Sequence, residues 1–167
     1  MYRITAVSTG NVCRSPLAEY LIRRALHAAG IDDVDVDSAG TSDGEAGSGA
    51  DPRAVSLLAA AGLDASGHTA RRFAPERFAA TDLVLALDID HYTALRRLAP
   101  TPAEQAKVRM LRSFDPAFAG RGPADQGIYD PWFGDEDDFE ACRQMISAAL
   151  PGLVEHVRAE TADARGA

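Results

Sequence analysis

A continuous apolar run at residues 83–87 (LVLAL) restricts the fold of this chain more than any other segment. A strand with one face in water alternates apolar and polar residues, whereas a strand covered on both faces is apolar throughout. Strands of the second kind are typical of parallel sheets that carry helices on both sides. The run therefore predicts an α/β protein in which this strand lies inside the sheet.

The rest of the chain alternates between strand-like and helix-like segments. Further strands are predicted at residues 2–7, 34–38 and 108–111. Capping residues and apolar periodicity predict four helices, at residues 16–29 with Ser15 as N-cap, 52–61 after Asp51, 89–98 after Asp88, and from about Asp135 or Asp137 to Arg158. This order predicts a three-layer α/β sandwich with a four-stranded parallel sheet.

Length and charge limit the classes of protein to which this chain can belong. Its 167 residues suit one compact domain, predicted at residues 1–160 and followed by a flexible tail at 161–167. The net charge of -8 opposes binding to nucleic acid and to anionic membranes. Its apolar runs are far shorter than the roughly 20 residues that cross a bilayer, and the N-terminus lacks a signal-peptide pattern.

Cysteine usage indicates the compartment. The chain has 2 cysteines, Cys13 and Cys142, which are too few for a disulfide framework or a closed zinc site. Its 4 histidines have no metal-ligand spacing with them. We therefore expect a soluble monomer in a reducing compartment, the cytoplasm, that needs no metal and no cofactor. The sequence leaves secretion open.

Residues 8–16 (STGNVCRSP) join the first predicted strand to the first predicted helix. Unpaired backbone N–H groups and the positive end of the helix dipole point at such a joint, which favours an oxyanion. Gly10 and Asn11 tolerate positive φ, so successive amides can turn inward, while Arg14 offers a planar fork to two phosphate oxygens. A plain strand–turn–helix joint capped by Ser15 would need most of the same residues.

These nine residues resemble the active-site signature of bacterial low-molecular-weight protein tyrosine phosphatases. That signature consists of a cysteine, five further residues and an arginine, followed by Ser-Pro. The resemblance continues in family order at residues 38–41 (SAGT), 50–54 (ADPRA), 68–71, 83–88 and 130–132 (DPW). It implies the family's fold and the hydrolysis of phosphotyrosine. It also implies that phosphate is held by Thr9, Gly10, Asn11, Val12, Cys13, Arg14 and Ser15. A nucleotide-binding loop is disfavoured, because neither G-x-x-x-x-G-K-[ST] nor G-x-G-x-x-G occurs.

The chain departs from the family at the nucleophile, where it has Ser8 instead of cysteine. In the family this cysteine attacks phosphorus as a thiolate and forms a cysteinyl-phosphate. Ser8 is either an engineered substitution that retains a phosphorylated ligand, which we favour because the other catalytic elements are present, or the natural residue of a pseudophosphatase that binds phosphotyrosine. Both interpretations predict little or no activity, restored by Ser8→Cys.

The reaction also needs an acid that protonates the departing phenolate. Of the three Asp-Pro pairs, Asp51-Pro52 caps a helix and Asp115-Pro116 begins a turn, which leaves Asp130. By resemblance, Asp130 is the general acid, and Trp132 and Phe133 form the wall of the cleft. The alternative is a turn whose aromatic residues pack into the core.

The resemblance further implies that Asn11, Ser15, Ser38 and His68 form a hydrogen-bonded network that holds the loop. Cys13 corresponds to a second cysteine that can form a protective disulfide with the nucleophile, which Ser8 makes impossible. We expect Cys142 to serve packing alone.

Two departures from the family's sequence pattern bear on the identity of the substrate. Val12 is apolar where arginine-phosphate phosphatases of this fold have threonine, which favours a phosphotyrosine protein or peptide. Residues 42–50 form a Gly-rich acidic lip instead of an aromatic one, and this lip is expected to be flexible and to disfavour acidic phosphopeptides. The rivals are an arsenate reductase, for which Cys142 is poorly placed to relay electrons, and a noncatalytic phosphate-binding module.

Overall fold

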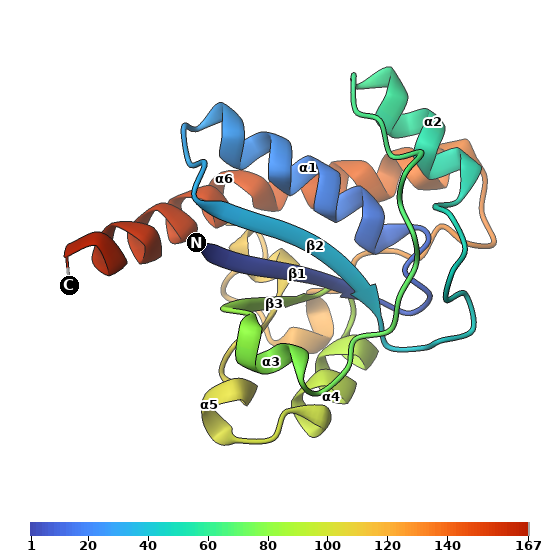
Figure 1. Cartoon of the computed structure of the whole chain (residues 1–167). Helices are drawn as coiled ribbons and strands as arrows, with labels where there is room; N and C mark the ends of the chain where they lie inside the picture. Colours follow the sequence, from blue (N-terminus) through green and yellow to red (C-terminus); the bar gives the residue numbers. More distant parts are fainter. Residues whose placement is uncertain (167) are drawn as a thin grey trace.

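Four parallel strands form the centre of the molecule (Figure 1). The computed structural model describes residues 1–166. The strands lie in the order β2-β1-β3-β4 and have these bounds: β1 Tyr2–Ser8, β2 Val34–Gly40, β3 Leu83–Ala86 and β4 Val108–Met110. All neighbouring strands are parallel. The four-stranded parallel sheet predicted from the sequence is confirmed.

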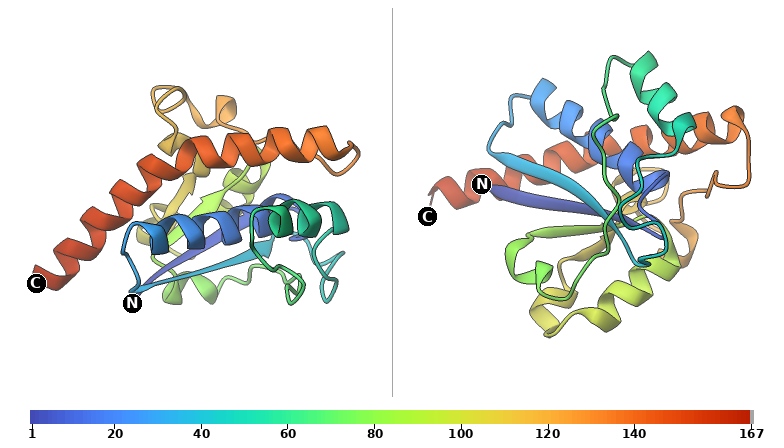
Figure 2. Two further views of the ribbon diagram at one scale, coloured as in Figure 1. Left: turned by 90° about the horizontal axis from the view of Figure 1, so that it is seen from above. Right: turned by 45° about the vertical axis from the view of Figure 1, so that its right-hand side comes forward.

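Helices cover both faces of this sheet, as Figures 1 and 2 show. One layer contains α1 (Arg14–Ala28), α2 (Pro52–Ala60) and α6 (Glu136–Gly166), and the other contains α3 (Arg77–Ala80), α4 (Ile89–Leu98) and α5 (Pro102–Gln105). Two short 3-10 helices, η1 (Leu111–Phe114) and η2 (Pro123–Asp125), follow β4. The predicted three-layer sandwich is therefore confirmed.

Strand β3 explains the unbroken apolar run in the sequence. Leu83 and Leu85 pack in the core cluster that includes α1 and α6, whereas Val84 and Ala86 pack in a second cluster on the opposite face. Because successive side chains of a strand point to opposite faces, both sets must be apolar when both faces are covered. The run belongs to an inner strand, between β1 and β4.

Two helix boundaries differ from the sequence prediction by two residues or more. Helix α1 begins at Arg14 with Cys13 as its N-cap, so the prediction of Ser15 as N-cap is wrong. The Ser15 hydroxyl bonds the side chains of Ser8 and Asn11 instead of capping the helix. Helix α6 was predicted to end near Arg158 but continues to Gly166.

The C-terminal extension of α6 occupies most of the segment predicted to be a flexible tail. Residues 161–166 are helical, and the Thr161 hydroxyl donates a hydrogen bond to the carbonyl of Val157. The segment contains Ala162, Ala164 and Arg165, and alanine and arginine are good helix formers. Residue 167 lies outside the described residues.

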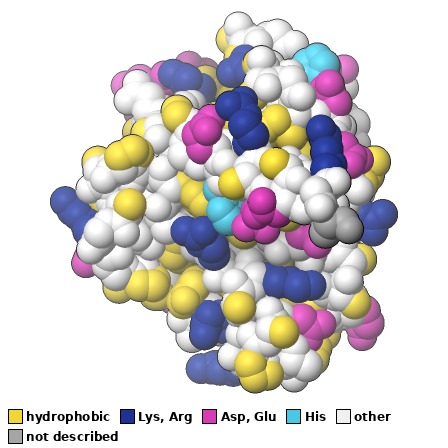
Figure 3. Space-filling model, turned by 90° about the vertical axis from the view of Figure 1, so that its left-hand side faces the viewer, with side chains coloured by type: hydrophobic (Ala, Val, Ile, Leu, Met, Phe, Trp, Pro, Cys, Tyr) yellow, Lys and Arg dark blue, Asp and Glu magenta, His cyan; other side chains and the backbone are white. Residues whose placement is uncertain are grey.

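The two ends of the strands carry different parts of the chain (Figure 1). On the side where the chain termini lie, Lys and Arg side chains are interspersed with Asp, Glu and apolar ones (Figure 3). The loops after β1 and β2 lie at the opposite, carboxyl end (Figure 1). Within residues 1–166, no helix is both long enough and apolar enough to span a membrane.

Candidate active site

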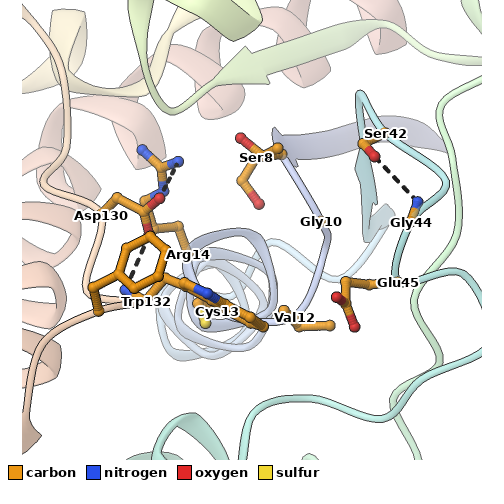
Figure 4. Close-up of a pocket in the computed structure, with 12 residues that line it drawn as sticks. Ser8, Gly10, Val12, Cys13, Arg14, Ser42, Gly44, Glu45, Asp130 and Trp132 are labelled. Atoms are coloured by element: carbon orange, nitrogen blue, oxygen red, sulfur yellow. Dashed lines mark hydrogen bonds and ion pairs between the residues drawn. The ribbon is translucent and has the colours of Figure 1, made fainter.

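A cleft of about 360 Å³ opens at the carboxyl end of the strands. Figure 4 shows the loop after β1 at its base, Asp130 and Trp132 on one side, and Ser42, Gly44 and Glu45 on the other. The lining residues are Ser8, Thr9, Gly10, Val12, Cys13, Arg14, Ser42, Gly44, Glu45, Asp130, Trp132 and Phe133. Three segments far apart in the sequence therefore converge on one concave surface, as ligand sites require.

Ser8 is the last residue of β1 and lies buried at the base of the cleft. Its Oγ lies 2.6 Å from the Oγ of Ser15 and accepts a hydrogen bond from the backbone N–H of Ser15 at 3.3 Å. This N–H belongs to the first turn of α1, where amides lack intrahelical partners and the helix dipole is positive. Position 8 is thus a place where negative charge on a side chain is stabilised.

Asn11 fixes the conformation of the loop. It is the only non-glycine residue with positive φ in the described chain, at 60°; Gly10, for which positive φ was also anticipated, does not adopt it. The Asn11 Nδ2 donates to the hydroxyls of Ser15 and Ser38, each at 2.9 Å, and its Oδ1 accepts from the Arg71 N–H at 3.0 Å. These three bonds stabilise the strained left-handed backbone.

His68 completes the group of supporting residues named from the sequence. Its Nε2 lies 2.8 Å from the carbonyl oxygen of Asn11, and the side chain is buried. Together with the bonds of Asn11 to Ser15 and Ser38, this contact brings all four supporting residues into one network. Their proposed effect on activity stays a prediction.

A buried carboxylate at the edge of this network was missed by sequence reasoning. Glu19 of α1 accepts a hydrogen bond from the Ser38 hydroxyl at 2.6 Å, and its other oxygen pairs with Arg23 at 2.6 Å. A glutamate followed four residues later by arginine usually marks an exposed helix face. The sequence therefore gave no signal that Glu19 is buried and orients Ser38.

Arg14 is buried beneath the cleft and held from three sides. Its Nη1 donates to the carbonyl of Ile128 at 3.0 Å and to the Asp88 carboxylate at 3.3 Å, while its Nη2 lies 3.4 Å from the Asp130 carboxylate. Asp88, which the sequence places between a strand and a helix, caps α4 through the N–H of Ile89, and its contact with Arg14 was not predicted. The guanidinium is thus oriented by groups from two separate loops, the one after β3 and the one before α6.

Asp130 lies at the rim with the two aromatic residues named from the sequence. Its Oδ1 accepts a hydrogen bond from the Trp132 N–H at 3.2 Å. Phe133 is 96% exposed and Trp132 is 39% exposed, so the alternative that these rings pack into the core is wrong. Arg53 of α2 fixes this loop by donating to the carbonyls of Trp132 at 3.0 Å and Gly134 at 2.7 Å.

Both cysteines are buried free thiols. Cys13 also lines the cleft, but its Sγ donates to the Asp51 carboxylate at 3.8 Å. Burial, reinforced by the negative charge of Asp51, raises the pKa of the Cys13 thiol to about 12. Burial likewise raises the pKa of Cys142 to about 12. Both thiols are therefore protonated at neutral pH, whereas a thiolate is the reactive form.

Thr9 has a histidine partner that the sequence did not reveal. The Nε2 of His91, on α4, lies 2.8 Å from the Thr9 hydroxyl, and the His91 ring is buried. Burial lowers the pKa of His91 to about 4, and the nearby positive charge of Arg14 contributes in the same direction. This ring is therefore neutral at neutral pH, and it contacts Thr9 instead of Ser8. The position of His91 in its predicted helix gave no indication of its contact with Thr9.

Known proteins are similar to this chain in sequence and in fold. A profile of the family described as low molecular weight phosphotyrosine protein phosphatase matches residues 3–163. The chain is 49% identical over 160 residues to a low molecular weight protein-tyrosine-phosphatase of Streptomyces coelicolor, with 94% of each chain covered. It is 46% identical over 151 residues to low molecular weight protein-tyrosine phosphatase A of Mycobacterium tuberculosis, covering 90% of this chain and 88% of that protein.

A structural comparison agrees with these sequence matches. A crystal structure of a protein tyrosine phosphatase from Entamoeba histolytica has a TM-score of 0.87 and 23% identity, covering 96% of this chain and 99% of that one, a likeness of fold alone. The sheet, the loop at the start of α1 and the buried arginine are features of α/β proteins in which a strand–helix loop can hold an oxyanion. Within that class, the chain belongs to the low molecular weight phosphotyrosine protein phosphatase family.

Proposed function

We propose that the cleft binds the phosphate group of phosphotyrosine and that hydrolysis in it requires a cysteine at position 8. The observation that carries this proposal is the environment of Ser8, whose Oγ lies against the N-terminus of α1. Phosphate oxygens are to be held by the loop amides and by the guanidinium of Arg14. The contacts of Arg14 with Asp88, Ile128 and Asp130 support this proposal, because they hold the guanidinium before the ligand arrives, so that little reorganisation is needed.

The proposed reaction takes place in the Ser8→Cys variant. The thiolate at position 8 attacks phosphorus, an S–P bond forms and the P–O bond to the phenol breaks as Asp130 donates a proton to the phenolate oxygen. Water then attacks phosphorus, Asp130 accepts its proton, and the S–P bond breaks to release phosphate. The Ser15 hydroxyl, which lies 2.6 Å from the Ser8 oxygen in the Ser8 chain, stabilises the departing sulfur of the variant.

The chain with Ser8 is proposed to bind phosphate with little or no turnover. A serine nucleophile needs a partner that accepts its proton. The Ser8 hydroxyl contacts the Ser15 hydroxyl and N–H, and the nearby neutral histidine, His91, contacts Thr9. Cys13 does not replace the missing thiol, because it faces Asp51 and is protonated.

Phosphotyrosine is the proposed substrate because of the depth and walls of the cleft. Ser8 and Arg14 lie buried at its base, while Trp132 and Phe133 are exposed at its mouth. A long aromatic side chain suits such a site, since its ring can contact the aromatic walls while its phosphate reaches the base. We further propose, from the sequence, that the protein acts as a monomer, and its free thiols suit the cytoplasm.

The proposal is tested by comparing the Ser8 chain with its Ser8→Cys variant. The Ser8 chain should bind inorganic phosphate and phosphotyrosine without hydrolysing an aryl phosphate, while the variant should hydrolyse it. Arg14→Ala should abolish binding in both proteins, because it removes the charged fork that pairs with the phosphate. Brisk hydrolysis by the Ser8 chain would contradict the proposed role of position 8.

Asp130 is tested in the Ser8→Cys background. Asp130→Ala should slow hydrolysis by about 10²–10⁴-fold for aryl phosphates with basic leaving groups, and by much less for those whose phenolates leave readily. The matched control is Asp135→Ala, which removes a carboxylate that lies in the same region but outside the cleft. Equal slowing for all leaving groups would contradict the role of Asp130 as the acid.

A further inference from the structure

Glu45 lies in the loop between β2 and α2 and lines the cleft opposite Asp130 (Figure 4). A Cβ atom built on Gly10 would lie 3.1 Å from its Cγ, so the Glu45 side chain passes directly over the loop that surrounds the phosphate site. When phosphotyrosine is bound in the cleft, the residues that flank it in the peptide therefore lie next to Glu45.

The backbone around Glu45 is held in place. The N–H of Gly47 donates to the carbonyl of Ala70 at 2.8 Å, and the N–H of Ala70 donates to the carbonyl of Ser48 at 2.8 Å. The N–H of Ser48 also donates to the carbonyl of Glu45 at 2.9 Å. These backbone hydrogen bonds fix the position of the Glu45 backbone, although the loop contains many glycines.

Two acidic residues of this loop have different surroundings. Asp43 pairs with Arg72 at 3.8 Å and does not line the cleft. Glu45 lines the cleft and has no ion-pair partner among residues 1–166. The charged residues of the cleft are thus Arg14 at the base and two carboxylates, Glu45 and Asp130, at the rim. A ligand meets a positive base beneath a negative mouth.

We infer that Glu45 selects phosphotyrosine peptides that carry Lys or Arg beside the phosphotyrosine and discriminates against those with Asp or Glu there. This inference rests on the proposed function of the cleft. A basic neighbour pairs with the Glu45 carboxylate, and its aliphatic stem can lie on the exposed ring of Phe133. An acidic neighbour meets a carboxylate of like charge, which opposes binding.

The test is a binding titration of the Ser8 chain with two phosphotyrosine peptides that differ only in basic or acidic flanking residues. The basic peptide should bind about two- to fivefold more tightly, the range expected for one solvent-exposed ion pair. The preference should shrink at about 1 M salt, where the Debye length falls to about 3 Å. Glu45→Gln should remove most of it, and Glu45→Lys should reverse it.

Asp43→Asn is the matched control. It changes the net charge by the same amount as Glu45→Gln in the same loop, but outside the cleft. The preference should therefore persist in Asp43→Asn. An equal loss in both variants would show that the overall charge of -8 attracts basic peptides, and this result would overturn the inference.

Inorganic phosphate separates failure of the inference from failure of the proposed function. Equal affinities for the two peptides, together with measurable phosphate binding, would overturn the role of Glu45 and leave the phosphate site intact. If neither phosphate nor either peptide binds, the proposed function fails and the inference fails with it.

Discussion

At the scale of single residues, Ser8 and Cys13 lie in the same segment but differ in the side-chain charge that their surroundings favour. Ser8 accepts a hydrogen bond from the N-terminal turn of α1, which stabilises negative charge. Cys13 donates to Asp51, and its pKa of about 12 shows that its surroundings oppose a thiolate. The same loop therefore offers one site that suits an anionic nucleophile and one buried thiol that does not.

His91 is the residue whose titration should be visible in the stability of the protein. Its pKa of about 4 in the folded chain lies below the ordinary 6.5, because burial disfavours the charged ring. Between these values the unfolded chain binds more protons, so stability is present above pH 6.5 and is lost as the pH falls to about 4. At about 1.4 kcal/mol per pKa unit, the loss amounts to roughly 3 kcal/mol.

Urea unfolding between pH 7 and pH 4 measures this loss. Carboxylates also titrate in this range, so the quantity to compare is the difference in slope between the parent chain and His91→Gln, which should be less sensitive to acid. His27→Gln, at an exposed histidine, should keep the slope of the parent. If His91→Gln keeps the same slope as well, the account of His91 as a buried neutral ring is wrong.

At the scale of elements, the end of β2 supports the loop that follows β1. The Gly40 N–H donates to the carbonyl of Arg71, and the N–H groups of Thr41 and Ser42 donate to the carbonyls of Ser8 and Thr9. A Cβ atom on Gly40 would lie 2.4 Å from the carbonyl oxygen of Thr9. Strand and loop thus approach so closely that only glycine fits.

Gly40→Ala should therefore disturb the phosphate site without touching a phosphate contact. We expect a loss of about 1–3 kcal/mol in unfolding free energy, the usual cost of overpacking, and weaker phosphate binding because Thr9 must move. Unfolding curves and phosphate titrations measure the two effects. Gly67→Ala is the control, since a Cβ atom there has no neighbour within 4 Å. Unchanged phosphate affinity in Gly40→Ala would contradict the supporting role of β2.

Elements with a strong local signal were predicted well, and those set by distant contacts were not. Asp51 caps α2 as expected, because the cap needs only the neighbouring N–H of Arg53. The start of α1 was misplaced, because the Ser15 hydroxyl has partners in β1 and in the loop. Short helices such as α3 and α5 were missed, since four residues carry no periodicity.

At the scale of the whole molecule, the sequence predicted the architecture and the family, and both are confirmed. Apolar runs and turn residues determine which segments lie inside, so the sheet and its covering helices could be inferred. The contacts of Glu19, Asp88 and His91 could not be inferred from the sequence, because each depends on which side chains the folded layers bring together. The loop at residues 8–16 could be recognised from its own sequence. Its distant partners could not, because no local sequence pattern indicates them.

The most direct test of the central claim is to locate the phosphoryl group after reaction. Ser8→Cys is mixed with an aryl phosphate, quenched in alkaline denaturant and digested at alkaline pH, where an S–P bond is stable, and the phosphorylated peptide is identified by mass spectrometry, with the Ser8 chain treated in parallel. We predict a phosphoryl group on the sulfur at position 8 of the variant and none on the Ser8 chain. A phosphoryl group on Cys13 or Thr9 in either protein would contradict the account.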